Sequence, residues 1–288
     1  MNGDSLQGWV DGLVPERGLG PKSAAVVAAV LSQPGKASYG TVHDVASISN
    51  VNVATVTRTA QALGFEGWPV FQRELRARYL SHLSAPEVAE QHAAAGSPAS
   101  NSVRQDLDSL SVLSRHLDYA LIEEVAAAVA TAHRTYVIGD GSYGALAVAF
   151  AHNARLAGYD AESVVGGGSD IANRMAYLTS DDVVVVISFW RIYANALEAA
   201  TVASEKGATV YVVTDALAPA LEKVADGVIT VPAEGTSFFP SLTSGISALQ
   251  AIVAQLTSID DKRSRATVAA AESQWQRFSL LFRRASGK

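Results

Sequence analysis

The chain of 288 residues contains no cysteine, which excludes disulfide bonds and thiolate chemistry and suits the reducing cytosol. Long hydrophobic runs are also missing, and the most apolar stretch, residues 183–187, is far too short to span a bilayer. The first 21 residues lack the basic start and apolar run of a secretory signal. We therefore expect a cytoplasmic protein that has no membrane partner.

Charged residues make up only 17 % of the chain and hydrophobic residues 49 %, so there is ample material for a buried core. The length fits one large domain or two. The net charge is −6, but residues 1–80 hold seven Lys or Arg against six Asp or Glu, so the acidic excess lies in the remainder. A near-neutral N-terminal domain is compatible with DNA binding as a dimer, because local placement of cations matters more than their total.

Prolines and N-cap residues divide the N-terminal region into short helices. The predicted helices cover residues 23–31, 42–48, 53–63 and the residues after Pro69. Pro34-Gly35 ends the first helix, Thr41 and Asn52 cap the second and third, and Gly64 closes the third. This order predicts a small all-α domain over residues 1–80.

A short helix, a tight turn over residues 49–52 and an N-capped second helix form a helix-turn-helix, which places its second helix in the DNA major groove. Asn52 and the helix N-terminus can contact phosphate, and the other polar residues can donate to phosphates or base edges. The alternative role for Arg58 is a buried ion pair with Glu66 or Asp44. The predicted DNA-contacting residues are Asn52, Thr55, Thr57, Arg58 and Gln61.

Two segments carry a family resemblance: Ala54-Thr55-Val56-x-Arg58, inside the turn and helix from Val45, and Leu63-Gly64-Phe65-x-Gly67-Trp68. Together they resemble the N-terminal domain of the RpiR (MurR/RpiR) family of bacterial transcriptional regulators. The resemblance implies a bacterial DNA-binding regulator, acting on double-stranded operator DNA, with a sugar isomerase (SIS) domain behind the DNA-binding domain.

The remainder of the chain predicts an α/β domain. Small and polar residues over 81–103 predict a linker, and leucines at helical spacing predict a helix over 103–132. From residue 135 strands and helices alternate, which implies a five-stranded parallel sheet flanked by helices. The expected strands are 135–139, 161–165, 182–188, 209–214 and 227–231, and the expected helices are 143–157, 169–178, 193–205, 216–224, 242–257 and 261–284. We place the ligand-sensing domain at 104–260 and a C-terminal helix at 261–288.

Ligands of open parallel sheets bind beyond the carboxyl ends of the strands. Three such ends are polar or glycine-rich in this chain, at residues 139–144, 188–193 and 214–215, and the glycine spacing of the first does not fit a dinucleotide fold. Ser241, Thr243 and Ser244 precede the long helix and can point into the same crevice, although helix capping alone explains them. The predicted ligand-binding residues are Gly141, Ser142, Tyr143, Ser188, Trp190, Arg191, Tyr193, Ser241 and Ser244.

Residues 136–256 resemble the SIS domain, which implies a flavodoxin-like fold that binds phosphosugars. The chain departs from the family at both loops: Tyr143 replaces a serine, and of the pattern Ser-x-Ser-Gly-x-Thr/Ser only Ser188 remains. Arg191 can hold an anion bidentately, and Trp190 and Tyr193 can stack on a ring or sugar face. The same side chains can instead fill the pocket or pack at a dimer interface.

Two other functions compete with a ligand-controlled regulator. A phosphosugar isomerase needs a carboxylate base, often with a histidine. No candidate has a second group at a spacing that would indicate a catalytic pair; the candidates are Glu162, Asp170, Glu198, Asp215, Glu234 and His152. The α/β domain can also serve only for oligomerisation. We expect no catalytic residues, no metal site and no cofactor. We expect a homodimer or homotetramer whose operator binding responds to a small effector, a sugar phosphate or another small anion.

Overall fold

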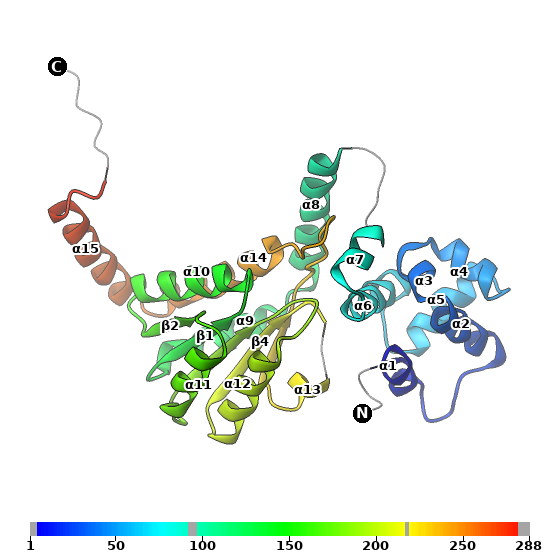
Figure 1. Ribbon diagram of the computed structural model, residues 1–288, viewed down its shortest axis with the longest axis horizontal. Helices are drawn as coiled ribbons and strands as arrows, with labels where there is room; N and C mark the ends of the chain where they lie inside the picture. The colour runs from blue at the N-terminus through cyan, green and yellow to red at the C-terminus, as the bar shows by residue number, and fades with distance from the viewer. Residues whose placement is uncertain (1–4, 92–96, 217–218, 282–288) are drawn as a thin grey trace, which may run out of the picture. The chain divides into compact units, whose positions relative to one another are not determined.

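The computed structural model describes residues 5–91, 97–216 and 219–281 (Figure 1). The chain divides into two compact units. Of the described residues, the first unit comprises 5–91, 97–108, 215–216, 219 and 234–241, and the second comprises 109–214, 220–233 and 242–281. No helix among the described residues is long and apolar enough to cross a membrane.

The first unit contains seven helices among its described residues before the chain reaches α8: α1 (Leu6–Leu13), α2 (Pro21–Ser32), α3 (Pro34–Tyr39), α4 (Val42–Ile48), α5 (Val53–Ala62), α6 (Trp68–Ser81) and α7 (Ala85–Gln91). Helices α2, α4, α5 and α6 share one core, in which Val26, Val56, Phe71 and Leu75 are almost completely buried. Burial of these side chains supplies the main stabilisation of so small a unit.

The structure differs from the sequence prediction in three places of the first unit. Helix α2 ends before Pro34, as predicted, but Pro34 also starts a short helix that was not predicted, α3, where a first-turn proline is tolerated. Helix α1 was not predicted, and its Trp9 stacks on Phe71 with ring centroids 5.6 Å apart. The expected linker over 81–103 includes α7 and the start of α8 (Pro98–His116). Residues 92–96 of that linker lie outside the described residues.

The second unit contains the α/β fold. After α8 and α9 (Tyr119–Thr131) its elements are β1 (Thr135–Gly139), α10 (Tyr143–Leu156), β2 (Ala161–Val164), α11 (Gly168–Ala176), β3 (Val183–Ile187), α12 (Ala194–Glu205), β4 (Thr209–Thr214), α13 (Pro219–Glu222), β5 (Gly227–Thr230), α14 (Thr243–Ile259) and α15 (Asp261–Arg277). All five strands are parallel, in the order β2-β1-β3-β4-β5. The expected five-stranded parallel sheet is therefore confirmed.

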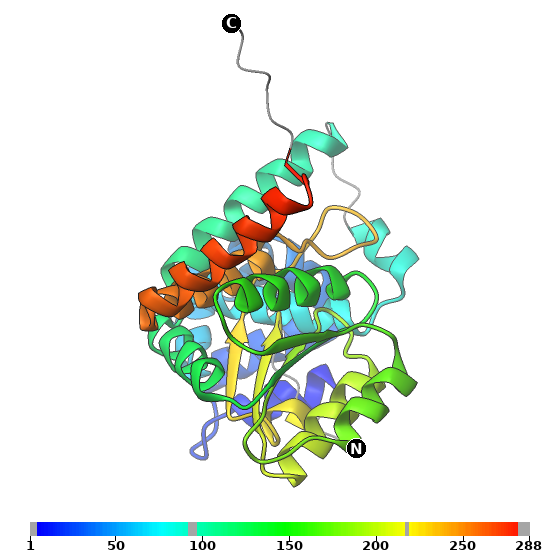
Figure 2. The same cartoon turned by 90° about the vertical axis from the view of Figure 1, so that its left-hand side faces the viewer.

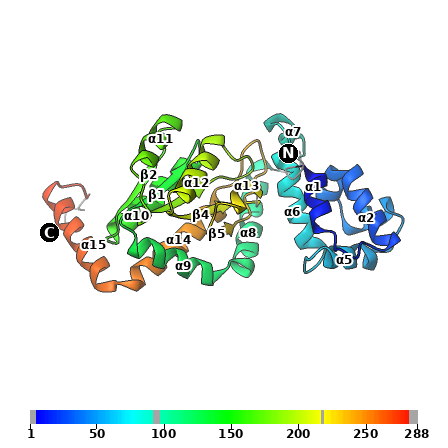
Figure 3. The same ribbon diagram turned by 90° about the horizontal axis from the view of Figure 1, so that it is seen from below.

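Helices cover both faces of this sheet, with α9, α10 and α14 on one side and α11 and α12 on the other (Figures 2 and 3). The central strands β1 and β3 are buried along their whole length, which explains their near-continuous apolar sequences. Alternate residues of β3 serve the two faces: Val183, Val185 and Ile187 pack on one core, and Val184 and Val186 on the other. The sheet thus separates two cores.

Two predicted helices of the second unit need correction. The expected helix over 103–132 is two helices, because Asp118 caps a new start at α9 by accepting a hydrogen bond from the Leu121 backbone N–H. The expected helix over 216–224 is represented by the short α13, and residues 217–218 are not described. Helix α15 begins where predicted and ends at Arg277.

Candidate functional site

The first candidate site is the surface of α5. Thr41 and Asp44 form a reciprocal capping box at the start of α4, in which Asp44 Oδ2 accepts from the Thr41 backbone N–H at 2.6 Å. In the turn, Asn50 adopts a left-handed φ of 51°, a conformation that asparagine tolerates. Asn52 then caps α5 by accepting from the Thr55 backbone N–H at 2.8 Å. The expected caps of both helices are thus confirmed.

The five predicted DNA-contacting residues lie along α5 with different degrees of exposure. Asn52, Arg58 and Gln61 are exposed, whereas Thr55 and Thr57 are partly buried. The Thr55 hydroxyl donates to Asn52 Oδ1, and the Thr57 hydroxyl donates to the Val53 carbonyl. The structure therefore presents Asn52, Arg58 and Gln61 on the exposed side of the helix, while both threonines, Asn52 and Gln61 make local hydrogen bonds.

The side chain of Arg58 is exposed, which contradicts the alternative that it forms a buried ion pair. Asp44, one of its expected partners, accepts from both the hydroxyl and the backbone N–H of Thr41. These bonds lower the pKa of Asp44 below its ordinary value. Within the described ranges, no ion pair includes Arg58. Its guanidinium can therefore reach a phosphate or a guanine edge.

The second candidate site is the carboxyl edge of the sheet where β1 and β3 lie side by side. The chain leaves these neighbouring strands toward opposite faces, to α10 and to α12, which makes this the topological switch point of a sheet with this order. The loop after β1 is residues 140–142, and the loop after β3 is residues 188–193. Both loops were predicted to bind ligand.

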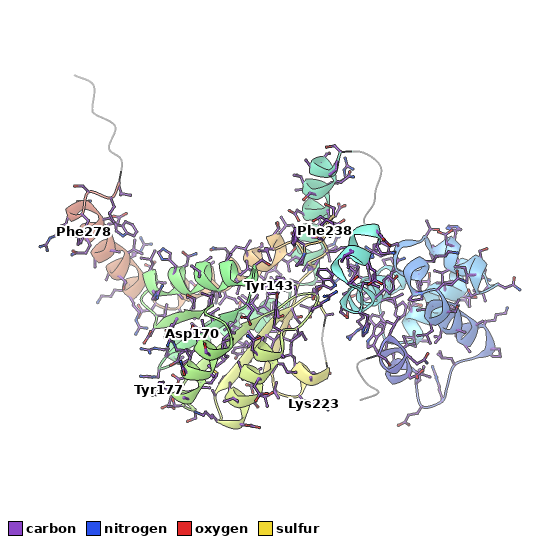
Figure 4. All side chains as sticks on the ribbon, in the orientation of Figure 1. Tyr143, Asp170, Tyr177, Lys223, Phe238 and Phe278 are labelled. Atoms are coloured by element: carbon purple, nitrogen blue, oxygen red, sulfur yellow. The ribbon has the colours of Figure 1, made fainter. Side chains whose placement is uncertain are left out.

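Tyr143 joins the two loops from inside the protein. Its side chain is buried, and its hydroxyl donates to the Phe189 carbonyl at 2.6 Å. Its ring meets the Phe189 ring edge-on, with centroids 5.2 Å apart. Phe189 in turn packs against Gly245 of α14, where an added Cβ would lie 2.7 Å from the Phe189 ring. Tyr143 (labelled in Figure 4) and Phe189 thus fill the space between α10, β3 and the start of α14.

The outer part of the same edge is lined by aromatic and cationic groups. Tyr193 is about half exposed, and its hydroxyl lies 3.2 Å from the position of a Cβ added to Gly141. Trp190 has a left-handed φ of 60°, which is strained for a bulky residue. The exposed Arg191 places its guanidinium 5.1 Å from the centre of the Trp190 ring. A planar cation and two rings therefore lie in the loop after β3, at the outer part of this edge.

Three helices begin at this edge without a side-chain N-cap. Neither Ser142 before α10, Tyr193 before α12 nor Leu242 before α14 makes a capping hydrogen bond through its side chain. The N–H groups of a first helical turn have no partner within the helix, and they attract anions. At the start of α10 the N–H groups of Tyr143, Gly144 and Ala145 already donate to the carbonyls of Asp140, Gly141 and Ser142. The starts of α12 and α14 are therefore the helix N-termini at this edge that favour an anionic ligand.

Two buried polar atoms near these helix starts also lack a hydrogen-bond partner within the part of the chain that the structure describes. They are Oδ2 of Asp140, which directly follows β1, and Oγ of Ser244, which lies in the first turn of α14. Leaving such groups unpaired is costly, and a bound ligand is one explanation for them. Ser244 was predicted as a ligand-binding residue, whereas Asp140 was missed, although its position between Gly139 and Gly141 was the available signal.

The other predicted ligand-binding residues lie in different surroundings. Ser142 is exposed at the start of α10, and the buried Ser188 donates through its hydroxyl to the Arg191 carbonyl at 3.2 Å. Ser241 belongs to the first unit, where its hydroxyl donates to Asp106 Oδ1 at 2.6 Å. The structure thus groups Ser188 with the loop after β3 and gives Ser241 a partner on α8.

Three of the carboxylates that could act as catalytic bases are engaged in ion pairs. Glu162 pairs with Arg174 at 2.7 Å, and Asp170 pairs with the same arginine at 3.6 Å. Glu234 pairs with Arg76 at 2.8 Å. Across the described ranges, no group of three or more His, Asp or Glu side chains is arranged to hold a metal ion. An isomerase needs a carboxylate that is available to take a proton, and these three are held by arginines instead.

Residues 128–260 match the SIS domain family. Two curated relatives, both uncharacterised helix-turn-helix transcriptional regulators, are 24 % identical to this chain. The alignment with the Haemophilus influenzae protein covers 69 % of this chain and 71 % of that protein. The alignment with the Bacillus subtilis protein covers 72 % of this chain and 74 % of that protein. The similarity to both extends beyond the residues that match the SIS family, since each alignment covers more than 200 residues.

Solved structures of low sequence identity share the fold. The Vibrio vulnificus NanR protein, complexed with ManNAc-6P, has a TM-score of 0.61 at 17 % identity and covers 96 % of this chain and 98 % of its own. The sugar isomerase domain of an RpiR transcription factor from Sphaerobacter thermophilus has a TM-score of 0.58 at 22 % identity, covering 61 % of this chain and 98 % of its own. The expected SIS fold is thereby confirmed.

Proposed function

Since residues 128–260 of this chain form a SIS domain that follows a helix-turn-helix, we propose that the protein is a DNA-binding transcriptional regulator controlled by a small metabolite. Helix α5 is the recognition helix, and two copies in a homodimer bind the two halves of an operator. The observation that carries this proposal is the open face of α5, on which the exposed guanidinium of Arg58 has no ion-pair partner within the described ranges. The names of the curated relatives support the same role.

The effector site is the β1/β3 edge. The uncapped starts of α12 and α14 and the exposed Arg191 favour a negatively charged group. The unpaired carboxylate oxygen of Asp140 favours a ligand that donates hydroxyl hydrogens, and Trp190 suits a sugar face. A hydroxylated anion such as a sugar phosphate satisfies both requirements. The ManNAc-6P complex of NanR supports this class of ligand.

Tyr143 and Phe189 fill the inner part of the site, so we place the effector at its outer part, near Tyr193, Trp190 and Arg191. The role is binding and not catalysis. A structure from Listeria monocytogenes that is named as a candidate sugar-phosphate isomerase shares the fold, with a TM-score of 0.51. However, three carboxylates that could serve as the base are already paired with Arg174 and Arg76. We therefore propose that the chain senses its ligand without converting it.

The test is binding of the full-length protein to DNA from upstream of its own gene, at several salt concentrations. Arg58→Ala should weaken specific binding about 5- to 150-fold, as expected for loss of a base contact worth about 1–3 kcal/mol. Arg265→Ala is the matched control, since Arg265 is an exposed arginine of α15 and should leave affinity unchanged. Equal binding of random DNA, or equal effects of the two variants, would overturn the proposal.

A second arm tests the effector. Hexose phosphates and the matching unphosphorylated sugars are added to the protein–DNA complex, with ManNAc-6P among them. A phosphosugar that changes operator affinity should lose its effect in Asp140→Asn, because the amide cannot replace the missing acceptor fully and adds a donor. A response that survives Asp140→Asn and Arg191→Ala would place the ligand elsewhere.

A further inference from the structure

Residues 234–241, which we call the tether, belong to the first unit, although the residues before and after them belong to the second. The tether leads from β5 to the first turn of α14, where the unpaired Ser244 hydroxyl lies. Chain connectivity therefore links the tether directly to the proposed effector site.

The start of the tether is fixed by Arg76 of α6. Arg76 Nη1 donates to Glu234 Oε2 at 2.8 Å, and Arg76 Nε donates to the Ser38 carbonyl at 2.9 Å. The Arg76 guanidinium also lies 4.8 Å above the centre of the Tyr39 ring. One arginine thus holds Glu234 and the carboxyl end of α3 together, and the ion pair is partly buried, with side-chain exposures of 24 % and 19 %.

Tyr39 gives Glu234 a second partner. Burial is the largest cause that raises the pKa of the Tyr39 hydroxyl, and the nearby Glu234 carboxylate raises it further. The hydroxyl therefore stays protonated and serves as a hydrogen-bond donor to Glu234. A carboxylate with two directional partners has a defined position, which a solvated surface glutamate lacks.

The other end of the tether is fixed as well. Ser241, its last residue, donates to Asp106 of α8 at 2.6 Å. Helix α6 carries Arg76 on one side and buries Phe71 and Leu75 in the core on which Val56 of the recognition helix also packs. Contacts within the first unit therefore run from the tether through α6 to α5, and the chain continues from the tether into α14.

We propose that the Arg76–Glu234 ion pair is the regulatory link through which occupancy of the proposed effector site, to which the start of α14 belongs, is communicated to the DNA-binding helices. Arg76 and Glu234 act as positioning residues that touch neither DNA nor effector. The link rests on the proposed function, and it has two arrangements, with the ion pair formed or broken. DNA and effector each favour one arrangement, so each changes the affinity of the other by the same factor.

Because this coupling is reciprocal, DNA itself can probe it without knowledge of the effector. Hydrogen exchange of residues 234–247 is measured in the full-length protein, with and without saturating DNA from upstream of its own gene. In the wild type, DNA should change exchange several-fold in this segment. Glu234→Ala and Arg76→Gln should abolish that change, and Glu234→Gln, which keeps an acceptor, should retain part of it. Asp261→Ala, which removes an exposed ion pair of α15, is the control.

Two outcomes overturn the link. One is a DNA-induced change that persists undiminished in Glu234→Ala and Arg76→Gln. The other is no change in the wild type even though DNA is bound. If the chain binds no DNA, the proposed function is overturned, and hydrogen exchange in the DNA-free samples becomes the test of the link. Arg76→Gln should then accelerate exchange several-fold at residues 243–247 of α14, and unaltered exchange there would overturn it.

Discussion

The hydroxyl of Tyr143 donates a 2.6 Å hydrogen bond to the carbonyl of Phe189, across 46 residues of sequence. The bond joins the loop after β1 to the loop after β3 at the centre of the proposed effector site. Both residues are buried, so the bond is shielded from water and from competition by solvent. The bond thus holds the loop after β3 against the start of α10.

Tyr143→Phe should lower the free energy of unfolding of the second unit by about 1–2 kcal/mol, because the buried Phe189 carbonyl loses its donor. The measurement is urea denaturation of the full chain, analysed for the transition of the second unit. Tyr177→Phe is the matched control, since Tyr177 is 80 % exposed and its hydroxyl should contribute almost nothing. Equal losses in the two variants would show that the Tyr143 bond carries no special stability.

Ser244→Ala should leave stability unchanged or raise it by up to about 1 kcal/mol, since it removes a buried hydroxyl that has no partner among the described residues. Ser264→Ala provides the comparison: Ser264 is also buried, but its hydroxyl donates to the Ala157 carbonyl at 3.1 Å. That variant should lose about 1 kcal/mol. A marked loss in Ser244→Ala would mean that its hydroxyl is bonded in the free protein.

The left-handed backbone of Trp190 predicts an order between two substitutions that both remove the ring. Trp190→Gly should be more stable than Trp190→Ala by about 1 kcal/mol, because only glycine occupies a φ near 60° without strain. Thermal or urea unfolding measures the difference. Should the alanine variant prove equally stable, the loop would not hold this conformation in solution. Both variants should also weaken any response to a sugar ligand, since the stacking face is gone.

The capping box of α4 predicts a pH-dependent contribution to stability. Hydrogen bonds from the Thr41 hydroxyl and backbone lower the pKa of Asp44 in the folded state. A carboxyl group with a lowered folded pKa stabilises the fold above its ordinary pKa and loses that effect as the pH falls through the folded value. The difference in unfolding free energy between wild type and Asp44→Asn should therefore be present at pH 7 and shrink below about pH 4.

The control for this experiment is Thr41→Ala, which removes the side-chain donor to Asp44 while leaving the carboxylate in place. The pH dependence attributed to Asp44 should become smaller in this background. An Asp44→Asn difference that stays constant from pH 7 to pH 3 would contradict the assigned cause.

Much of the fold could be predicted because its signals are local. The buried runs of β1 and β3, the N-caps Thr41 and Asn52 and the polar loops at the strand ends are features of a few consecutive residues. Periodicity and capping act within one or two turns of chain, so the sequence can express them without reference to the rest of the molecule. Helix α1 was missed because it is stabilised by contact of Trp9 with Phe71, 62 positions away.

The sequence by itself determined the strands, the helix-turn-helix and the loops that surround the β1/β3 edge. Only the tertiary structure decided which side chains occupy the space between these loops. The Tyr143–Phe189 hydrogen bond, and the burial of Asp140 Oδ2 and Ser244 Oγ without a hydrogen-bond partner among the described residues, depend on which strands are neighbours. The same holds for the Arg76–Glu234 pair, whose members are 158 residues apart. Charge and hydrogen-bonding capacity are properties of single residues. Packing decides which residues become partners, because it brings together side chains that are far apart in the sequence.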